Sequence, residues 1–81
     1  MRIVFAPRAI ESLRDAPSAV RAAFTKQMGL LAENLRHPSI RAKKYDDARN
    51  IWQGRVNGDW RFYFVIAGDA ITILKVIPHP K

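Results

Sequence analysis

The chain has 81 residues, no cysteine, and a formal net charge of +7 at pH 7. This length predicts a single domain, residues 1–81, and a hydrophobic content of 48% is enough for a core. Disulfides and thiolate metal sites are excluded for this sequence. No apolar run approaches the roughly 18 residues of a transmembrane helix. The first residues also lack the long apolar region of a signal peptide, so we expect a cytoplasmic protein that does not bind membranes.

Charge is the first functional indication. Fourteen Lys and Arg residues outnumber seven Asp and Glu residues, which gives a pI near 10.6. A field of this sign attracts polyanions and speeds encounters with them. The composition therefore favours nucleic acid or an acidic protein as the partner.

The N-terminal part is predicted to contain a strand followed by two helices. Residues 2–5 form the strand, because alternate residues there share a face. Pro7 starts a short first helix, since proline is tolerated at the first helical position, and Ile10 and Leu13 mark its buried side. Pro17 starts the second helix.

The second helix carries the clearest periodic pattern. Its apolar residues follow one another at steps of four, four, three and four, which predicts one buried stripe. The stripe consists of Val20, Phe24, Met28, Leu31 and Leu35. We interpret it as core and assign no functional site to it. Pro38 ends the helix, because proline disfavours helical geometry at the residue before it.

Residues 40–50 show no periodic pattern, and we interpret them as a basic loop. Its cations are Arg41, Lys43, Lys44 and Arg49. Lysine side chains in such a loop are suited to contacts with a nucleic-acid backbone. Lys43 and Lys44 are therefore candidate binding residues.

The last thirty residues are predicted to form a three-stranded meander. The strands are residues 51–56, 60–67 and 70–77, joined by turns at residues 57–59 and 68–69. Asn-Gly in the first turn supplies the positive backbone angles of a tight hairpin. The predicted order is β-α-α-β-β-β. It indicates an α+β fold in which a helical hairpin packs on one face of a mostly antiparallel sheet.

Alternation along the middle strand separates a core face from an open face. The apolar residues on one face are Trp60, Phe62, Phe64 and Ile66. Arg61 therefore points away from the core, and Arg55 in the preceding strand shares its face. The two arginines flank the 57–59 turn. For an outward-facing Arg61 we expect replacement to cost no more than about 0.5 kcal/mol of stability.

The third strand is harder to orient, because both of its faces are largely apolar. One face consists of Thr72, Leu74 and Val76, and the other of Ile71, Ile73, Lys75 and Ile77. This pattern leaves two alternatives open. Either the strand is interior and covered on both sides, or a partner buries part of its outer face.

The charged residues suggest chemistry on a phosphate. Two arginines on one strand face are suited to bind a phosphate group and stabilise its developing charge. His79 is suited to transfer protons near neutral pH, and Lys81 follows it. Together these groups fit RNA cleavage in which the ribose 2′-hydroxyl attacks the adjacent phosphate. No carboxylate cluster or His/Cys spacing indicates a metal, and we expect no cofactor.

The order and content of these segments resemble RelE/ParE superfamily toxins. The C-terminal likeness lies in residues 51–66, 68–69 and 71–76, and the N-terminal likeness in residues 5–13 and 31–38. The resemblance implies the RelE-like microbial RNase fold and a toxin of a type II toxin–antitoxin pair with an acidic antitoxin. In that superfamily the RelE-like branch cleaves mRNA in the ribosomal A site, whereas the ParE-like branch targets DNA gyrase.

The resemblance also implies roles for individual residues. Arg61 matches the arginine of the RelE-like Tyr/Trp-Arg strand motif, which contacts the scissile phosphate. Arg55 and Gln53 fall where RelE-like enzymes have lysines. His79 resembles the terminal histidine of several ribosome-dependent relatives, and Lys81 is similar in place to a basic residue after the last strand. The sequence departs from the pattern in the neutral Gln53 and in having no evident glutamate base or C-terminal tyrosine.

The leading hypothesis is therefore a ribosome-dependent mRNA endonuclease that acts without a metal. Arg61 would stabilise the phosphorane-like transition state with help from Arg55, and His79 would act as general acid or base. The RNA backbone would be held by Lys43, Lys44 and Lys81. Two alternatives remain: a gyrase-inhibiting toxin without catalytic activity, and a degenerate toxin that only binds its antitoxin.

Overall fold

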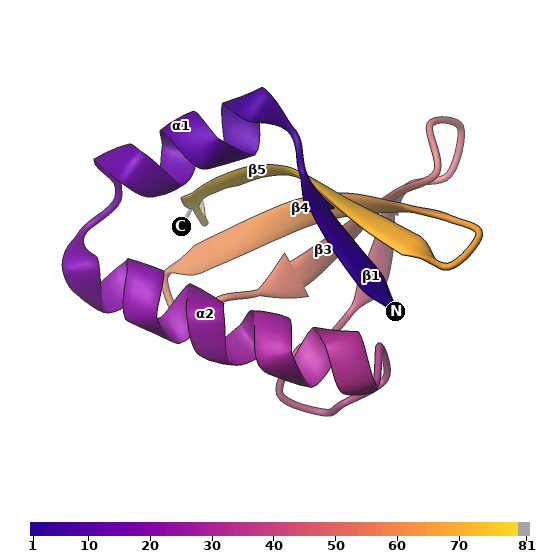
Figure 1. Cartoon of the computed structure of the whole chain (residues 1–81), viewed down its shortest axis with the longest axis horizontal. Helices are drawn as coiled ribbons and strands as arrows, with labels where there is room; N and C mark the ends of the chain where they lie inside the picture. Colours follow the sequence, from indigo (N-terminus) through magenta and orange to yellow (C-terminus); the bar gives the residue numbers. More distant parts are fainter. Residues whose placement is uncertain (80–81) are drawn as a thin grey trace.

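The computed structural model describes residues 1–79 and contains two helices and a five-stranded sheet (Figure 1). The elements are β1 (Arg2–Phe5), α1 (Pro7–Asp15), α2 (Ser18–Glu33), β2 (Lys43–Asp46), β3 (Ile51–Arg55), β4 (Trp60–Ala67) and β5 (Ala70–Pro78). The strand order is β1-β5-β4-β3-β2, and only β1 runs parallel to its neighbour. The predicted α+β class and mostly antiparallel sheet are confirmed. Neither helix in residues 1–79 is both long and apolar enough to cross a membrane.

Both helices pack on the same face of the sheet. The face of α2 that meets the sheet consists of Val20, Phe24, Gln27 and Leu31, all buried. The predicted stripe is thus confirmed in its main residues, although the helix ends at Glu33. In α1 the buried residue is Ala9, whereas Ile10, predicted to be buried, is half exposed. The small side chain of Ala9 packs in the core, whereas Ile10 lines an apolar groove together with Phe24 and Met28 of α2.

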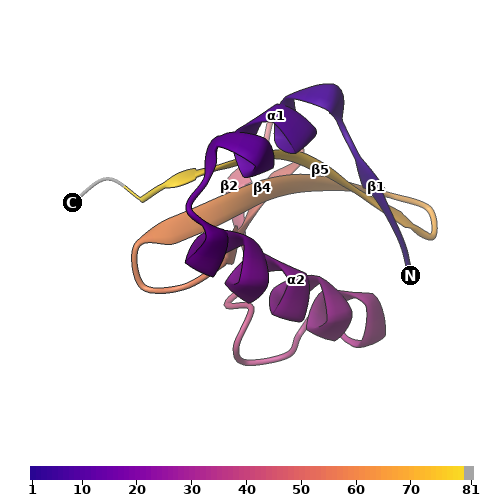
Figure 2. The ribbon, with the colours of Figure 1, turned by 60° about the vertical axis from the view of Figure 1, so that its left-hand side comes forward.

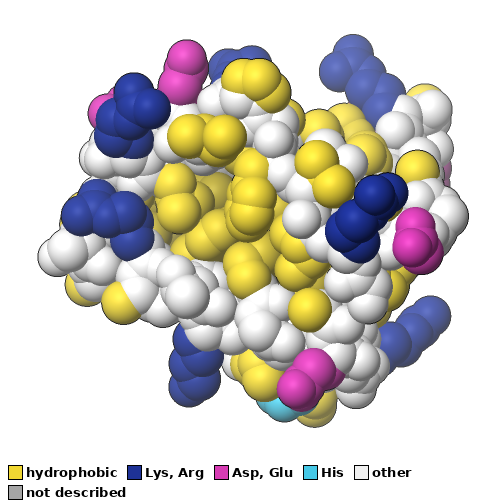
Figure 3. All heavy atoms as spheres, viewed as in Figure 1, with side chains coloured by type: hydrophobic (Ala, Val, Ile, Leu, Met, Phe, Trp, Pro, Cys, Tyr) yellow, Lys and Arg dark blue, Asp and Glu magenta, His cyan; other side chains and the backbone are white. Residues whose placement is uncertain are grey.

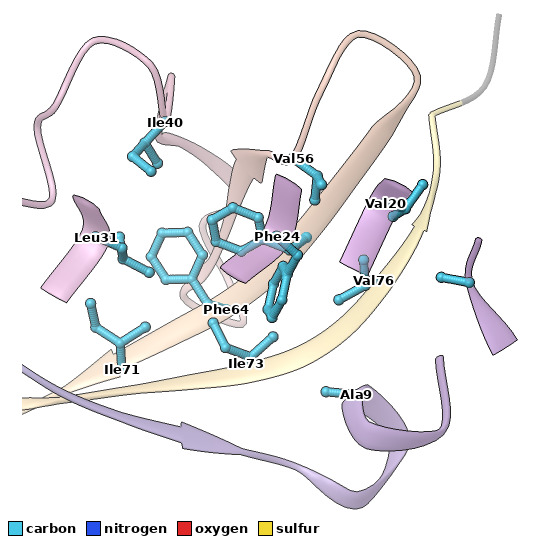
Figure 4. Close-up of a cluster of buried hydrophobic side chains, with 12 residues drawn as sticks. Ala9, Val20, Phe24, Leu31, Ile40, Val56, Phe64, Ile71, Ile73 and Val76 are labelled. Atoms are coloured by element: carbon cyan, nitrogen blue, oxygen red, sulfur yellow. The ribbon is translucent and has the colours of Figure 1, made fainter. Parts of the chain in front are cut away.

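The core lies between this helical layer and the sheet (Figure 4). Its largest fully buried side chains are Phe62, Phe64, Leu31, Ile40, Ile71, Ile73 and Val76. The ring of Phe24 from α2 meets the ring of Phe62 edge-on at 5.8 Å, and Phe62 stacks on Phe64 at 5.5 Å. Apolar area buried in this way is the main source of folding free energy.

A β-bulge in β5 resolves the ambiguity of the third predicted strand. Tyr63 pairs with Lys75, but the next residue, Phe64, pairs with Ile73, so Leu74 has no partner in β4. The extra residue inverts the alternation of faces from that point on. Ile73 is therefore buried against the helices while Lys75 turns to the opposite face. The strand is interior, as the first alternative held, because β1 and β4 flank it. Both of its faces looked apolar in the sequence because the bulge changes which of its residues face the core.

The segment predicted as a basic loop contains a further strand. Lys43 pairs with Gln53 and Lys44 with Trp52, which makes β2 the antiparallel edge of the sheet. Residues 40–50 lack an apolar alternation because an edge strand exposed on most sides does not need one. Its strand conformation comes from pairing with β3 rather than from its own side chains.

The turn between β3 and β4 differs from the tight hairpin that Asn-Gly suggested. Four residues separate the strands, and neither Asn57 nor Gly58 has a positive φ. The Asn57 side chain instead accepts hydrogen bonds from the backbone N–H groups of Asp59, at 2.9 Å, and Trp60, at 3.0 Å. A longer turn held by a side chain does not need the positive angles of a two-residue loop.

Gly54 is required where β3 crosses the core. A Cβ atom at this position would lie 2.2 Å from the ring of Phe62. We expect Gly54→Ala to lower the free energy of unfolding by about 1–3 kcal/mol through overpacking. As a matched control, Gly29 in α2 has open space around the same position. Gly29→Ala should raise the free energy of unfolding by about 0.5–1 kcal/mol through helix propensity. Urea denaturation followed by circular dichroism measures both changes, and equal effects would contradict this packing.

Candidate functional site

The face of the sheet opposite the helices, called here the open face, collects polar and charged side chains. Arg55 is the direct cross-strand partner of Arg61, and Gln53 is the partner of both Tyr63 and Lys43. Directly opposed residues in neighbouring strands point to the same side of a sheet. The prediction that Arg55 and Arg61 share a face in neighbouring strands is therefore confirmed.

Cations converge on one cleft of this face. The cleft has a volume of about 210 Å³ and is lined by Arg41, Lys43, Gln53, Gly54, Arg55 and Arg61. We call it the basic cleft. Within residues 1–79, the ion pairs are Arg2–Asp69 and Arg49–Asp46, and neither involves a cation of the cleft. Four positive side chains without carboxylate partners in the described chain create a field that favours binding of an anion.

The guanidinium of Arg61 is anchored to the β3–β4 turn. Its Nη1 atom donates hydrogen bonds to the carbonyl oxygens of Asn57, at 2.6 Å, and Trp60, at 2.9 Å. Arg61 is also partly buried. The sequence alone predicted almost no cost in stability for its replacement, whereas these bonds predict a larger cost, because the side chain satisfies carbonyl groups of the turn. Within residues 1–79, Nε and Nη2 of Arg61 make no such bonds. The edge of the guanidinium that carries these two nitrogens can therefore donate two hydrogen bonds to a ligand.

A buried glutamine holds the backbone beneath the cleft. Gln27 of α2 is only 4% exposed. Its Nε2 atom donates to the carbonyl oxygens of Arg55, at 2.7 Å, and Ser39, at 3.0 Å. The hydroxyl of Ser39 donates back to Oε1 of Gln27 at 3.2 Å. One amide group therefore joins α2 to β3 and to the segment that leads into Arg41.

Sequence reasoning missed Gln27, although a signal was present. Gln27 lies three residues after Phe24 and four before Leu31, so it belongs to the buried stripe in which Met28 was placed. A polar residue within an apolar stripe needs hydrogen-bond partners inside the protein. Those partners come from segments distant in the chain, which the periodic pattern does not identify.

Arg41 lines the basic cleft but was not assigned to the site from the sequence. It has a left-handed backbone with a φ of 50°, which is uncommon for a residue other than glycine. It follows the fully buried Ile40, whose carbonyl oxygen accepts a hydrogen bond from the N–H of Arg55 at 2.7 Å. This backbone conformation directs the chain from the core contact at Ile40 to the cleft. No local sequence signal predicts it.

The remaining predicted residues fall in three different places. The backbone N–H of His79 donates to the carbonyl oxygen of Asp59 at 2.7 Å. His79 thus lies at the end of the sheet that carries the β3–β4 turn, where Figures 1 and 2 show the end of β5. Lys44 lies on the opposite face of β2, 4.7 Å above the Trp52 ring, so it does not join the cleft. Lys81 lies outside the described residues.

Tyr63 lies beside the cleft as a neutral hydroxyl. It is 5% exposed. Burial raises the pKa of Tyr63 above its ordinary value of 10.0, and Tyr45 raises it further, whereas Arg61 lowers it. Because the pKa is raised, the phenol keeps its proton at neutral pH and cannot serve as a general base there. Among residues 1–79, no three His, Cys, Asp or Glu side chains are grouped as a metal site would require.

We expect Gln27→Leu to lower the free energy of unfolding by about 1–3 kcal/mol, because two buried carbonyl groups lose their donor. Lys26→Met, at the adjacent exposed position, is the control and should change it by less than about 0.5 kcal/mol. Urea denaturation measures both. Equal stability of the two variants would mean that the Gln27 bonds do not hold β3 to α2.

Comparison with known proteins identifies structures of similar fold. No protein-family model and no curated protein matches the chain. A chain of the RelB–RelE antitoxin–toxin complex from Methanococcus jannaschii has a TM-score of 0.79 at 19% identity, over 93% of this chain and 88% of that one. The YoeB/ParE toxin from Agrobacterium tumefaciens has a TM-score of 0.80 at 9% identity, over 99% and 100%.

A chain of the RelBE2 toxin–antitoxin complex from Mycobacterium tuberculosis is similar in the same way. It has a TM-score of 0.78 at 20% identity and covers 96% of each chain. Likeness at such low identity concerns the fold. The chain therefore has the fold of RelE/ParE superfamily toxins, which confirms the fold implied by its sequence resemblance.

Proposed function

We propose that this chain is the toxin of a type II toxin–antitoxin pair and that its basic cleft cleaves mRNA bound to the ribosome. The observation that carries the proposal is the pair Arg55 and Arg61, direct cross-strand partners that line one cleft with Arg41 and Lys43. A cleft with four cations fits a phosphodiester better than a neutral substrate. The RelE/ParE toxin fold supports the same assignment.

The proposed reaction is attack of a ribose 2′-hydroxyl on the adjacent phosphate. The new bond joins the 2′ oxygen to phosphorus, and the bond from phosphorus to the 5′ oxygen breaks. Negative charge grows on the phosphate oxygens during this step, and the guanidinium groups of Arg61 and Arg55 stabilise it. Because Arg61 is already held by the turn, its charge needs little reorganisation as the reaction proceeds.

Two protons must move in this reaction, and we assign His79 to one of them. The 2′-hydroxyl loses a proton to a base, and the leaving 5′ oxygen gains one from an acid. His79 is exposed and is joined through its backbone to Asp59 beside the arginine pair. The cleft itself contains no strong base, since its polar residues are cations and Gln53. We therefore propose that the ribosome positions the RNA and so supplies much of the rate enhancement.

The proposed partner is an acidic antitoxin. An acidic segment across the open face would neutralise the cations of the cleft. The helical face offers a second surface, an apolar groove of about 310 Å³ lined by Phe5, Ala9, Ile10, Leu13, Phe24, Thr25 and Met28. Figure 3 shows this apolar area with Lys and Arg side chains around it. An amphipathic helix with an acidic outer side fits such a groove.

Arg61→Gln should slow mRNA cleavage on the order of a hundredfold or more, because the transition state loses a fixed positive charge. It should also lower the free energy of unfolding by about 1–2 kcal/mol, because the bonds to the turn are weakened. Arg14→Gln on the exposed side of α1 is the control and should change neither. The measurement is primer extension on cellular mRNA after induced expression, with unfolding followed by circular dichroism.

A gyrase supercoiling assay on the same proteins separates the two toxin classes. Codon-phased cleavage by the wild-type protein with intact supercoiling supports the proposal. Loss of supercoiling without mRNA cleavage would instead assign the protein to the gyrase-inhibiting class. Full cleavage by a folded Arg61→Gln variant would exclude Arg61 from the mechanism.

The antitoxin proposal predicts that a small acidic protein encoded beside this chain forms a complex with it. Ile10→Glu should weaken that complex about tenfold or more, since it places a charge in the apolar groove where Ile10 is 50% exposed. Glu11→Gln, on the adjacent exposed position, is the control. Titration calorimetry measures the affinities, and failure of the two wild-type proteins to co-elute at low salt would contradict this partner.

A further inference from the structure

Tyr45 is an exposed aromatic side chain beside the basic cleft that the proposed reaction does not use. With 60% exposure it is the most exposed of the large hydrophobic side chains in residues 1–79. It lies in β2 at the irregular position between Lys44 and Asp46, where it has no partner in β3. A single exposed ring is common on protein surfaces, so what distinguishes Tyr45 is its contact with Tyr63 and its place beside the cleft.

The ring of Tyr45 is oriented by Tyr63. The two ring centroids are 4.8 Å apart, and the rings meet edge-to-face at 70°. Tyr63 is itself almost fully buried in β4, so it offers a fixed support. The ammonium group of Lys75 lies 5.1 Å from the centre of the Tyr63 ring. Tyr45 thus packs against the buried Tyr63 ring and leaves most of its own surface to solvent.

Strand register places this ring next to the phosphate-binding residues. Tyr63 is the cross-strand partner of Gln53, and Gln53 is the partner of Lys43. Gln53 and Lys43 both line the basic cleft. Tyr45 follows Lys43 by two residues and contacts Tyr63, so it lies on the open face as well. A ligand that extends from the cleft along the open face therefore meets the Tyr45 ring.

We infer that Tyr45 is a stacking platform for a nucleobase of single-stranded RNA whose backbone lies in the basic cleft. This inference rests on the proposed function for the identity of the nucleic acid. Proteins that bind single strands combine cationic grooves with aromatic rings, because every base has a π-face that stacks on them. Lys43 and Lys75 on either side of the tyrosine pair bind the backbone on both sides of the stacked base.

The combination favours RNA over a protein as the occupant of this ring. A strand of RNA carries a planar base and a charged phosphate at each step, and the open face presents an aromatic ring and cations together. Purine bases have the larger stacking area, so adenine should bind more tightly than uracil. Stacking on Tyr45 then adds a preference for a purine as the base next to the phosphate in the cleft. The arginines alone do not provide this preference.

The test is fluorescence anisotropy of labelled hexa-adenylate and hexa-uridylate RNA with the purified full chain at low salt. Tyr45→Leu keeps an apolar cover over Tyr63 but removes the aromatic face. It should weaken binding of hexa-adenylate about tenfold and remove the preference over hexa-uridylate. Tyr45→Phe keeps the ring and should retain affinity within about twofold. The salt dependence of binding should be the same in all three proteins, because the phosphate contacts remain.

Val4→Ala, an exposed apolar change in β1 at the opposite edge of the sheet from β2 and Tyr45, is the control and should bind like wild type. Unchanged hexa-adenylate binding by a folded Tyr45→Leu variant would overturn the inference. If that variant instead loses only its complex with the acidic partner protein, Tyr45 is a protein contact and the inference is also overturned. If the wild-type protein does not cleave mRNA but shows the Tyr45-dependent preference, the proposed reaction fails while this inference stands.

Discussion

One extra residue in β5, Leu74, keeps the two faces of the sheet chemically distinct. Before it Ile71 and Ile73 face the helices, and after it Val76 does, while Lys75 turns to the open face. A regular strand that buried Ile73 would also direct Lys75 into the core, because alternate residues share a face. An unpaired lysine there would cost several kcal/mol. The bulge therefore permits an apolar core and a cationic open face on the same strand.

The basic cleft depends on neutral contacts rather than on ion pairs. Gln27 bonds to the backbone of Arg55, and the carbonyl oxygens of the β3–β4 turn hold the guanidinium of Arg61. These contacts position the charges without neutralising them. Four like charges in one cleft repel each other, and the packed core offsets this cost. An anion in the cleft removes the repulsion, which is why the same arrangement favours binding.

The chain shares its fold with structures to which its sequence has little identity. Identities of 9–20% accompany TM-scores of 0.78–0.80, so the pattern of apolar and polar positions preserves the fold without preserving its residues. A fold shared in this way does not establish an activity. In this chain Gln53 is neutral and buried in the cleft, while Arg41 brings a cation from the preceding segment. The chemistry therefore has to be argued from this cleft.

The sequence by itself determined the elements that depend on local patterns. The apolar stripe of α2 and the alternation in β4 follow from periods of 3.6 and two residues, and they also place Arg55 and Arg61 on one face. Tertiary structure alone decided the strand at Lys43–Asp46, the face of Lys44 and the bonds of Gln27. Each of these depends on another segment of the chain: the first two on pairing with β3, and the bonds of Gln27 on Ser39 and Arg55. Periodicity describes one segment at a time, so it cannot supply that partner.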